Sequence, residues 1–142
     1  MNEQRRITTA DEEQTIQLGR EIGSTLEAGT IIALSGPLGS GKTTLVKGIA
    51  QSLDIHEAVT SPTFTIIQEY DGRLALHHMD LYRIDSVEEF DLLGAEELFY
   101  QQGVTVIEWS EKISELLPSS ALHITCSIED DGSRVITIGG AS

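Results

Sequence analysis

The sequence is poor in cations, cysteine and long apolar segments. Nine Lys and Arg stand against 23 Asp and Glu, which gives the 142 residues a formal net charge of −14. Arg5 and Arg6 form the only adjacent basic pair. Proteins that bind nucleic acid directly neutralise several phosphates with clustered cations, so we expect no strong nucleic-acid binding by this chain itself. An acidic surface suits a basic partner, or simply confers solubility.

Other absences restrict where the protein works. No apolar run approaches the roughly 18 residues of a membrane span, and no apolar segment follows Met1–Arg6 as it would in a secretory signal. Cys126 stands alone in an alternating, strand-like segment, which is typical of a structural thiol in a reducing compartment. We therefore expect a cytoplasmic protein without membrane contact. The length predicts a single domain over residues 1–142.

The stretch 30–44 carries the most specific pattern. Thr30–Ser35 predicts a short apolar strand, Gly36–Thr43 fits the phosphate-binding loop G-x-x-x-x-G-K-[ST], and Gly41–Asp54 has the apolar spacing of a helix. The alternative is a glycine-rich turn with a chance Lys-Thr. Strand and helix stand where a phosphate-binding loop requires them, so the stretch predicts nucleotide binding.

The residue types of this loop suit a phosphate. Glycine permits backbone conformations in which successive amides point inward at an anion, and the following helix adds its N-terminal N–H groups. Lys42 is expected to reach the β- and γ-phosphates, and the Thr43 hydroxyl to ligate Mg²⁺. The expected nucleotide contacts in the loop are Pro37, Leu38, Gly39, Ser40, Gly41, Lys42, Thr43 and Thr44.

Two acidic residues are candidates for a metal ligand and a catalytic group. Phosphate-loop enzymes hold Mg²⁺ with a second carboxylate at the tip of a neighbouring strand. Glu108 follows a mostly apolar predicted strand, and Asp80 ends another strand in a more polar setting. We assign Thr43 and Glu108 to the metal and Asp80 to orienting or deprotonating the attacking water, beside the catalytic Lys42. Exchanged roles for Asp80 and Glu108 are the alternative.

The remaining pattern predicts an α/β fold. We expect one phosphate-loop NTPase-like domain with a mixed, mostly parallel sheet, antiparallel hairpins and flanking helices. The expected elements are a helix from an N-cap at Thr9, with Glu12 completing the capping box, to about Leu26; strands Phe64–Tyr70 and Arg73–His78 joined at Asp71-Gly72; a helix from Ser86 to about Leu93 that resumes over Ala95–Gln102; a strand Val104–Trp109; a helix capped by Ser110 that ends near Leu117; and a hairpin of Ala121–Ile128 with Arg134–Ile138.

Several positions keep two interpretations. Asp11 is either a first-turn partner of the helix dipole or a neighbour of the nucleotide base. Trp109 is either a half-buried core aromatic or a mobile side chain that gates the nucleotide site. Ser61-Pro62-Thr63 is either a turn or a switch that senses the γ-phosphate. The acidic stretch Asp85–Glu97 is either a solvated helix face or a docking surface.

Four blocks of sequence occur in a family-specific order: Gly36–Thr44, Ser61–Phe64 (S-P-T-F), His78–Arg83 (H-M-D-L-Y-R) and Ile107–Trp109 (I-E-W). Together they resemble the bacterial TsaE (YjeE) family, over a stretch from about Asp11 to Arg134. The phosphate-binding loop alone is common to many families, whereas its combination with the other three blocks is highly specific.

The resemblance implies a small cytoplasmic ATPase required for the threonylcarbamoyladenosine (t6A37) modification of tRNA. It implies that the protein binds ATP and Mg²⁺ and docks on the TsaD–TsaB transferase complex, which ATP hydrolysis resets between turnovers. It also places the Mg²⁺ ligands at Thr43 and Glu108, the required aspartate at Asp80, and further nucleotide contacts at Asp11 and Arg134.

The loop departs from the family at two positions. The family usually has Asp and Ala where this chain has Pro37 and Ser40. Proline lacks an amide donor, but Pro37 precedes the amides expected to surround the phosphates, so we expect nucleotide binding to be retained. The absence of the acidic side chain at position 37 is expected to affect ATP turnover or metal binding.

Other functions are less well supported. GTP is disfavoured because the only asparagine, Asn2, cannot supply an Asn-Lys-x-Asp guanine reader. A small-molecule kinase needs a lid with arginines, yet beyond the loop the chain has only Arg73, Arg83 and Arg134 and no arginine-bearing helical insert. An ATP-dependent interaction module with negligible hydrolysis of its own remains open. Few cations in cis predict a slow ATPase that accelerates in a complex.

Overall fold

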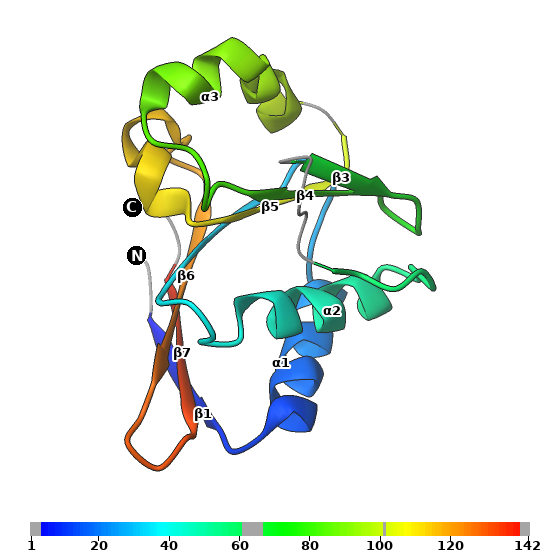
Figure 1. Cartoon of the computed structure of the whole chain (residues 1–142). Coiled ribbons are helices and arrows are strands. Elements are labelled where there is room, and N and C mark those ends of the chain that lie inside the picture. The colour runs from blue at the N-terminus through cyan, green and yellow to red at the C-terminus, as the bar shows by residue number, and fades with distance from the viewer. Residues whose placement is uncertain (1–3, 61–66, 101, 140–142) are drawn as a thin grey trace.

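The computed structural model describes residues 4–60, 67–100 and 102–139, which form a mixed sheet with helices on both faces (Figure 1). Across the sheet the described strands are ordered β1-β7-β6-β2-β5-β4-β3. This arrangement confirms the predicted α/β fold. The elements are β1 (Arg5–Thr9), α1 (Glu12–Ser24), β2 (Ile31–Ser35), α2 (Lys42–Ser52), β3 (Ile67–Tyr70), β4 (Leu76–Asp80), α3 (Val87–Leu93), the 3-10 helix η1 (Ala95–Tyr100), β5 (Val104–Glu108), the 3-10 helix η2 (Ser110–Leu116), β6 (Leu122–Ile128) and β7 (Arg134–Gly139).

A parallel core brings the carboxyl ends of several strands to one edge of the sheet. β2 pairs in parallel with β5 and β6, and β5 pairs in parallel with β4, while β3, β7 and β1 are added antiparallel. At the carboxyl ends Asp80 lies opposite Glu108, and Glu108 lies opposite Leu34 of β2. Open α/β sheets bind their ligands at this edge, and the phosphate-binding loop leaves β2 at the same place.

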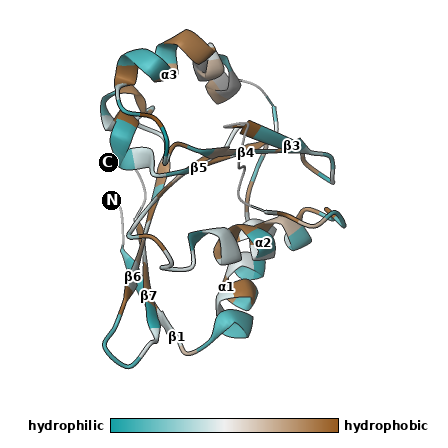
Figure 2. Cartoon of the chain, in the orientation of Figure 1, coloured by the Kyte–Doolittle hydropathy of each residue, from teal (hydrophilic) through white to brown (hydrophobic). Residues whose placement is uncertain are grey.

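Side chains that alternate along the strands fill two hydrophobic cores. Val106 of β5 lies in the core that α1 and α2 share, whereas Ile107 lies in the core with residues of α3, η1 and η2. The central strands are accordingly hydrophobic along the ribbon in Figure 2, and the β6–β7 turn is hydrophilic. Because successive strand residues point to opposite faces, Glu108 lies on the same face as Val106, toward α2.

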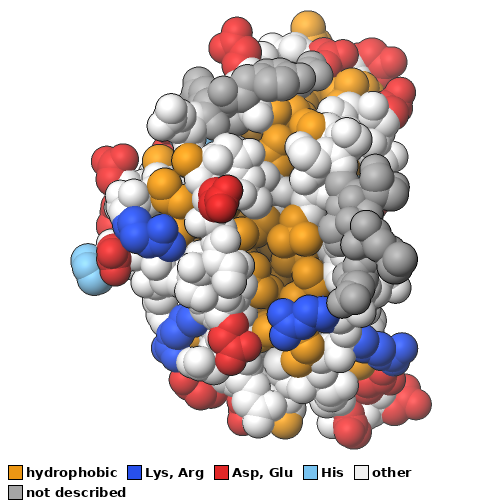
Figure 3. Space-filling view, turned by 180° about the vertical axis from the view of Figure 1, so that it is seen from behind, with side chains coloured by type: hydrophobic (Ala, Val, Ile, Leu, Met, Phe, Trp, Pro, Cys, Tyr) orange, Lys and Arg blue, Asp and Glu red, His pale blue; other side chains and the backbone are white. Residues whose placement is uncertain are grey.

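The surface mixes acidic groups with an apolar area. Figure 3, which shows the molecule from behind, has Asp and Glu side chains around the outline, separate Lys and Arg side chains, and an apolar band down the middle of that face. Among the described helices, none is long and apolar enough to cross a membrane.

The predicted start of the first helix is wrong. Thr9 does not cap it, because Thr9 ends β1, a strand that the sequence did not predict, and its hydroxyl lies 2.7 Å from that of Thr15 in a buried contact. Asp11 is the N-cap of α1, and its Oδ1 accepts a hydrogen bond of 2.9 Å from the Gln14 amide. The non-local pairing of β1 with β7 therefore shifts the cap by two residues.

The other expected elements were found with differences at their ends. Ser86 caps α3 as predicted, through a 3.2 Å bond from the Glu89 amide. The predicted cap at Ser110 is wrong: Trp109 is the N-cap residue of η2, and the Ser110 hydroxyl donates to the Leu34 carbonyl at 3.1 Å. The β3–β4 pair is antiparallel as predicted, but five residues, 71–75, connect it instead of a two-residue turn.

The backbones of α1 and α2 touch at glycines. A Cβ atom at Gly48 of α2 would overlap the carbonyl oxygen of Ile16 and lie 2.9 Å from the Gly19 Cα. These contacting atoms belong to the backbone of α1, so no side-chain movement relieves them. Only glycine at position 48 allows the two helices to pack this closely, and α2 begins at the phosphate-binding loop.

Gly48→Ala is expected to lower the free energy of unfolding by about 1–3 kcal/mol, the usual cost of overpacking, although alanine favours a helix over glycine by about 1 kcal/mol. Gly139→Ala is the control, because its Cβ would lie at an ordinary 3.6 Å from Gln4 Cγ. Urea unfolding of both variants measures the difference. A stability of Gly48→Ala equal to or above that of the unaltered protein contradicts the close helix contact.

Candidate active site

The loop between β2 and α2 has the backbone of an anion-binding site. Gly36, Gly39 and Gly41 have φ angles of 138°, 77° and 100°, which side-chain-bearing residues rarely adopt. A Cβ at Gly36 would also overlap the carbonyl oxygen of Cys126 in β6. Gly41 is the N-cap of α2 and offers no side-chain oxygen to its first amides. Those amides and the helix dipole suit an anion at this position.

Lys42 is folded into the loop. Its side chain is 5% exposed, its Nζ donates a 2.6 Å hydrogen bond to the Gly36 carbonyl, and Nζ lies 3.5 Å from the centroid of the Trp109 ring. Burial lowers the pKa of Lys42, and the negative charges of Glu108, Glu111 and Asp80 oppose that shift. The lysine ammonium thus contacts a neutral carbonyl and an aromatic face. A phosphate anion would form a stronger, charge-assisted hydrogen bond with it than either of these groups does.

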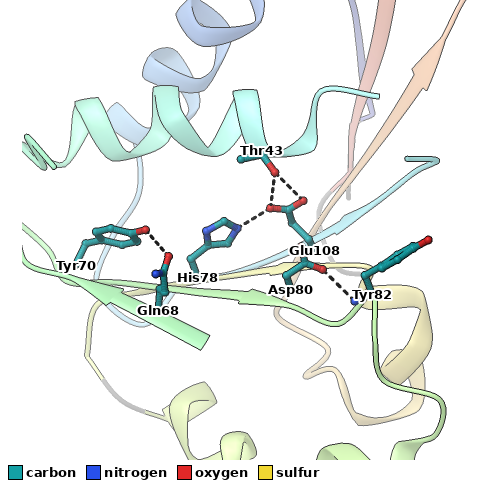
Figure 4. Close-up of polar contacts among 7 residues, drawn as sticks. All are labelled: Thr43, Gln68, Tyr70, His78, Asp80, Tyr82 and Glu108. Carbon is teal, nitrogen blue, oxygen red and sulfur yellow. Dashed lines mark hydrogen bonds and ion pairs between the residues drawn. The ribbon is translucent and has the colours of Figure 1, made fainter. Parts of the chain in front are cut away.

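Glu108 joins the loop helix to the sheet (Figure 4). Thr43 Oγ1 lies 3.2 Å from Oε1 and 3.0 Å from Oε2 of Glu108, and His78 Nε2 lies 2.6 Å from the same Oε2. Glu108 is 3% exposed and His78 is 0% exposed. Three elements, α2, β4 and β5, therefore meet at one buried carboxylate.

Asp80 lies beside Glu108 but has different surroundings. It is half-buried at the end of β4, and its Oδ1 accepts a 2.9 Å hydrogen bond from the Tyr82 amide (Figure 4). Lys112 of η2 secures the segment that follows Asp80, since its ammonium donates to the carbonyls of Tyr82 and Ile84. The structure thus brings Asp80, Glu108, Thr43 and Lys42 to the same edge of the sheet.

The donor set fits Mg²⁺ in the company of phosphates. In the described part of the chain, no three or more His, Cys, Asp and Glu side chains converge on a common metal position. The Thr43 hydroxyl and the Glu108 carboxylate lie within hydrogen-bond distance of each other beside the loop and can both act as oxygen ligands. Mg²⁺ is usually bound by one or two protein oxygens together with substrate phosphates and water, so these residues fit the expected cation.

The remaining predicted contacts lie around the loop. Leu38 is exposed at its tip, the Pro37 carbonyl accepts from the Ser40 amide at 3.2 Å, and the Ser40 Oγ is buried without a hydrogen-bond partner among the described residues. Arg134 donates to the Gly39 carbonyl at 3.2 Å. Thr44 is half-buried in the first turn of α2.

Asp11 and Arg134 come from neighbouring strand ends. Thr9, two residues before Asp11, pairs with Arg134 across β1 and β7. A Cβ at Gly41 would lie 3.9 Å from Arg134 Nε and 4.0 Å from the Thr15 methyl group. The start of α1 and the start of β7 therefore border the loop, although the contact that Asp11 makes in the structure is its helix cap.

Sequence reasoning missed the role of one residue and left others open. The predicted strand ended at His78 and gave this residue no contact at the site, whereas β4 continues to Asp80 and the ring of His78 contacts Glu108. Its position two residues before Asp80 was the available indication, because a strand puts both on one face. Trp109 packs against the second core and also covers Lys42, with its own ring 5.1 Å from that of Tyr82. The suggested switch Ser61-Pro62-Thr63 lies outside the described residues.

Related proteins carry one common name. The chain is 44% identical to the tRNA threonylcarbamoyladenosine biosynthesis protein TsaE of Treponema pallidum, over 94% of this chain and 98% of the relative. It is 43% identical to the protein of the same name from Bacillus subtilis, over 91% of this chain and 81% of the relative. A third relative of that name, from Haemophilus influenzae, is 33% identical over 88% of this chain and 83% of its own length.

The fold and a family model agree with these relatives. The crystal structure of YdiB from Bacillus subtilis superimposes with a TM-score of 0.86 at 37% sequence identity, covering 100% of this chain and 88% of YdiB. The family model described as threonylcarbamoyl adenosine biosynthesis protein TsaE matches residues 9–136. These findings confirm the resemblance drawn from the four sequence blocks. The chain belongs to the TsaE family of tRNA threonylcarbamoyladenosine biosynthesis proteins.

Proposed function

We propose that residues 1–142 act as one Mg²⁺-dependent ATPase domain that works in the cytoplasm on the TsaD–TsaB transferase complex. ATP hydrolysis would reset that complex between rounds of tRNA modification. The observation that carries the proposal is the bond from the Thr43 hydroxyl to the buried Glu108 carboxylate, directly after the phosphate-binding loop. A hydroxyl on the loop helix and a carboxylate on the adjacent strand are the protein ligands that Mg²⁺ has in phosphate-loop NTPases.

Each residue then has a distinct task. The amides of the loop and the ammonium of Lys42 bind and orient the phosphates, and Thr43 with Glu108 would hold Mg²⁺, which when bound neutralises charge on the β- and γ-phosphate oxygens. Asp80 orients or deprotonates the attacking water. The contact of Glu108 with Thr43, and that of Asp80 with the Tyr82 amide, favour this division over the exchanged one.

The surroundings favour slow hydrolysis by the isolated protein. Transition-state charge on a phosphoryl group is commonly neutralised by an arginine supplied in cis or by a partner. Here Arg134 is engaged with the carbonyls of Gly39 and Gly132, and Lys112 with those of Tyr82 and Ile84. A partner that supplies or frees a cation would raise the rate. An ATP-dependent interaction module with negligible hydrolysis is the second candidate, and the same engaged cations favour it.

The charge of the chain supports a protein partner as the holder of the tRNA. The formal net charge is −14, and Lys and Arg are scattered on the face shown in Figure 3. α3 carries Glu88, Glu89 and Asp91 beside an exposed Leu92, which suits a basic surface with apolar character. We propose this helix as part of the docking face.

Phosphate release from ATP should be slow for the protein alone and rise with TsaD–TsaB by roughly tenfold or more, because a single added transition-state donor is worth about 10²–10³-fold in other enzymes. The measurement is steady-state phosphate release with and without the pair, in Mg²⁺ and in EDTA. Brisk turnover by the isolated protein contradicts the slow ATPase, and no release even in the complex favours the interaction module.

Lys42→Ala is expected to weaken ATP binding by roughly 10–100-fold, since hydrogen bonds to charged groups contribute about 1.5–3 kcal/mol. Lys47→Ala is a matched control, because Lys47 is exposed on the same helix and its loss leaves the loop unchanged. Equilibrium binding of ATP in Mg²⁺ gives both affinities. Equal ATP affinity in the two variants refutes the loop as the phosphate site.

Glu108→Gln and Asp80→Asn should separate binding from turnover. Glu108→Gln removes a charge from the cation site and is expected to raise the Mg²⁺ requirement for nucleotide binding. Asp80→Asn is expected to leave binding intact and to lower turnover in the complex by about 10²–10⁴-fold, the usual share of general acid–base catalysis. Mg²⁺ titrations and single-turnover rates distinguish them, and the reverse pattern establishes the exchanged roles.

A further inference from the structure

His78 is the buried neighbour of the Glu108 carboxylate. It lies in β4 on the face toward α2, and its Nε2 is 2.6 Å from Glu108 Oε2 (Figure 4). With exposed fractions of 0% and 3%, the two side chains meet away from solvent. When the Glu108 carboxylate is ionised it only accepts hydrogen bonds, and Nε2 of His78 is then the donor.

The carboxylate needs this second donor. The Thr43 hydroxyl has a single hydrogen, so its contacts of 3.2 Å and 3.0 Å with the two oxygens of Glu108 share one donor. A carboxylate taken out of water is costly unless its oxygens are bonded. His78 supplies a second donor to the carboxylate, at Oε2, and restrains rotation of the carboxyl group beside Thr43.

We propose that His78 is a positioning residue that orients Glu108 toward Mg²⁺ and thereby sets the affinity of the site for the cation. The inference rests on the proposed function, in which Thr43 and Glu108 hold Mg²⁺. His78 would act through Glu108, whose Oε2 its ring contacts. Residues that hydrogen-bond a metal ligand from behind typically contribute about 10–100-fold in metal affinity.

His77 provides a matched control in the same strand. It is buried as well, but it points to the opposite face, where Nδ1 lies 3.4 Å from Glu69 Oε2 and Nε2 lies 3.4 Å from the Gln102 carbonyl. A substitution at His77 therefore perturbs burial and the strand to a similar degree and leaves the surroundings of Glu108 unchanged.

Two amides of different reach test the hydrogen bond. The amide nitrogen of His78→Gln takes the place of Nε2, whereas the side chain of His78→Asn is one methylene shorter and falls short of Glu108. ADP is titrated by calorimetry at graded Mg²⁺ and in EDTA. Mg²⁺ is expected to raise the affinity for ADP, and the midpoint is the Mg²⁺ concentration at which half of this increase is reached. We expect His78→Asn to raise this midpoint by about 10–100-fold, and His78→Gln to raise it by no more than about threefold. ADP affinity in EDTA should be the same in all variants, and His77→Asn should keep the midpoint of the unaltered protein.

A double variant separates positioning from a general loss of structure. In a Glu108→Gln background, His78→Asn should move the Mg²⁺ midpoint no further, since residues acting in one chain of contacts are not additive. An unchanged midpoint in His78→Asn, or an equal shift in His77→Asn, refutes the positioning role. If His78→Asn does not fold, His78→Gln decides: a retained midpoint supports the role, and a tenfold shift refutes it. If ADP binding by the unaltered protein shows no dependence on Mg²⁺, the proposed function fails together with the inference.

Discussion

The buried carboxylate of Glu108 is the constraint on which the site depends. It is the point where the loop helix, through Thr43, and the strand β4, through His78, meet the central strand β5. A negative charge in such a place is tolerated only with donors on its oxygens, so the contacts that stabilise this carboxylate also define the proposed cation site. One set of hydrogen bonds therefore both stabilises the buried carboxylate in the folded protein and forms the proposed cation site.

The rest of the fold explains why these groups meet. Strands that run in parallel end at the same edge, and the pairing of β4, β5 and β2 places Asp80, Glu108 and Leu34 side by side. The loop after Leu34 turns back over that edge because Gly36 and Gly41 adopt positive φ angles. The close contact of α1 with α2 at Gly48 then fixes the direction of the loop helix relative to the sheet. Lys42 and Thr43, the first two residues of that helix, receive their positions from this packing.

The elements that were predicted correctly are those whose structure is determined by residues close together in the sequence. The loop, the strand that precedes it and the strand that ends at Glu108 each have a spacing or composition that requires one structure, and so does the helix capped by Ser86. The wrong predictions concern residues whose structure depends on contacts with a segment far away in the sequence. Thr9 is a strand residue because β7, more than a hundred residues away in the chain, pairs with it, and Ser110 donates to Leu34 of β2 instead of capping its own helix. The contact of His78 was missed for the same reason, since its partner Glu108 lies thirty residues further on.

The order of the strands also bears on how copies of the protein behave toward one another. β1 forms one edge of the described sheet, and an edge strand offers unpaired backbone groups on which a second chain can add. Arg5 and Arg6 are both exposed on this strand, and as consecutive residues they place a positive charge on each of its faces. Two copies aligned edge to edge would bring like charges together. Charged side chains on an edge strand disfavour the strand addition that begins aggregation.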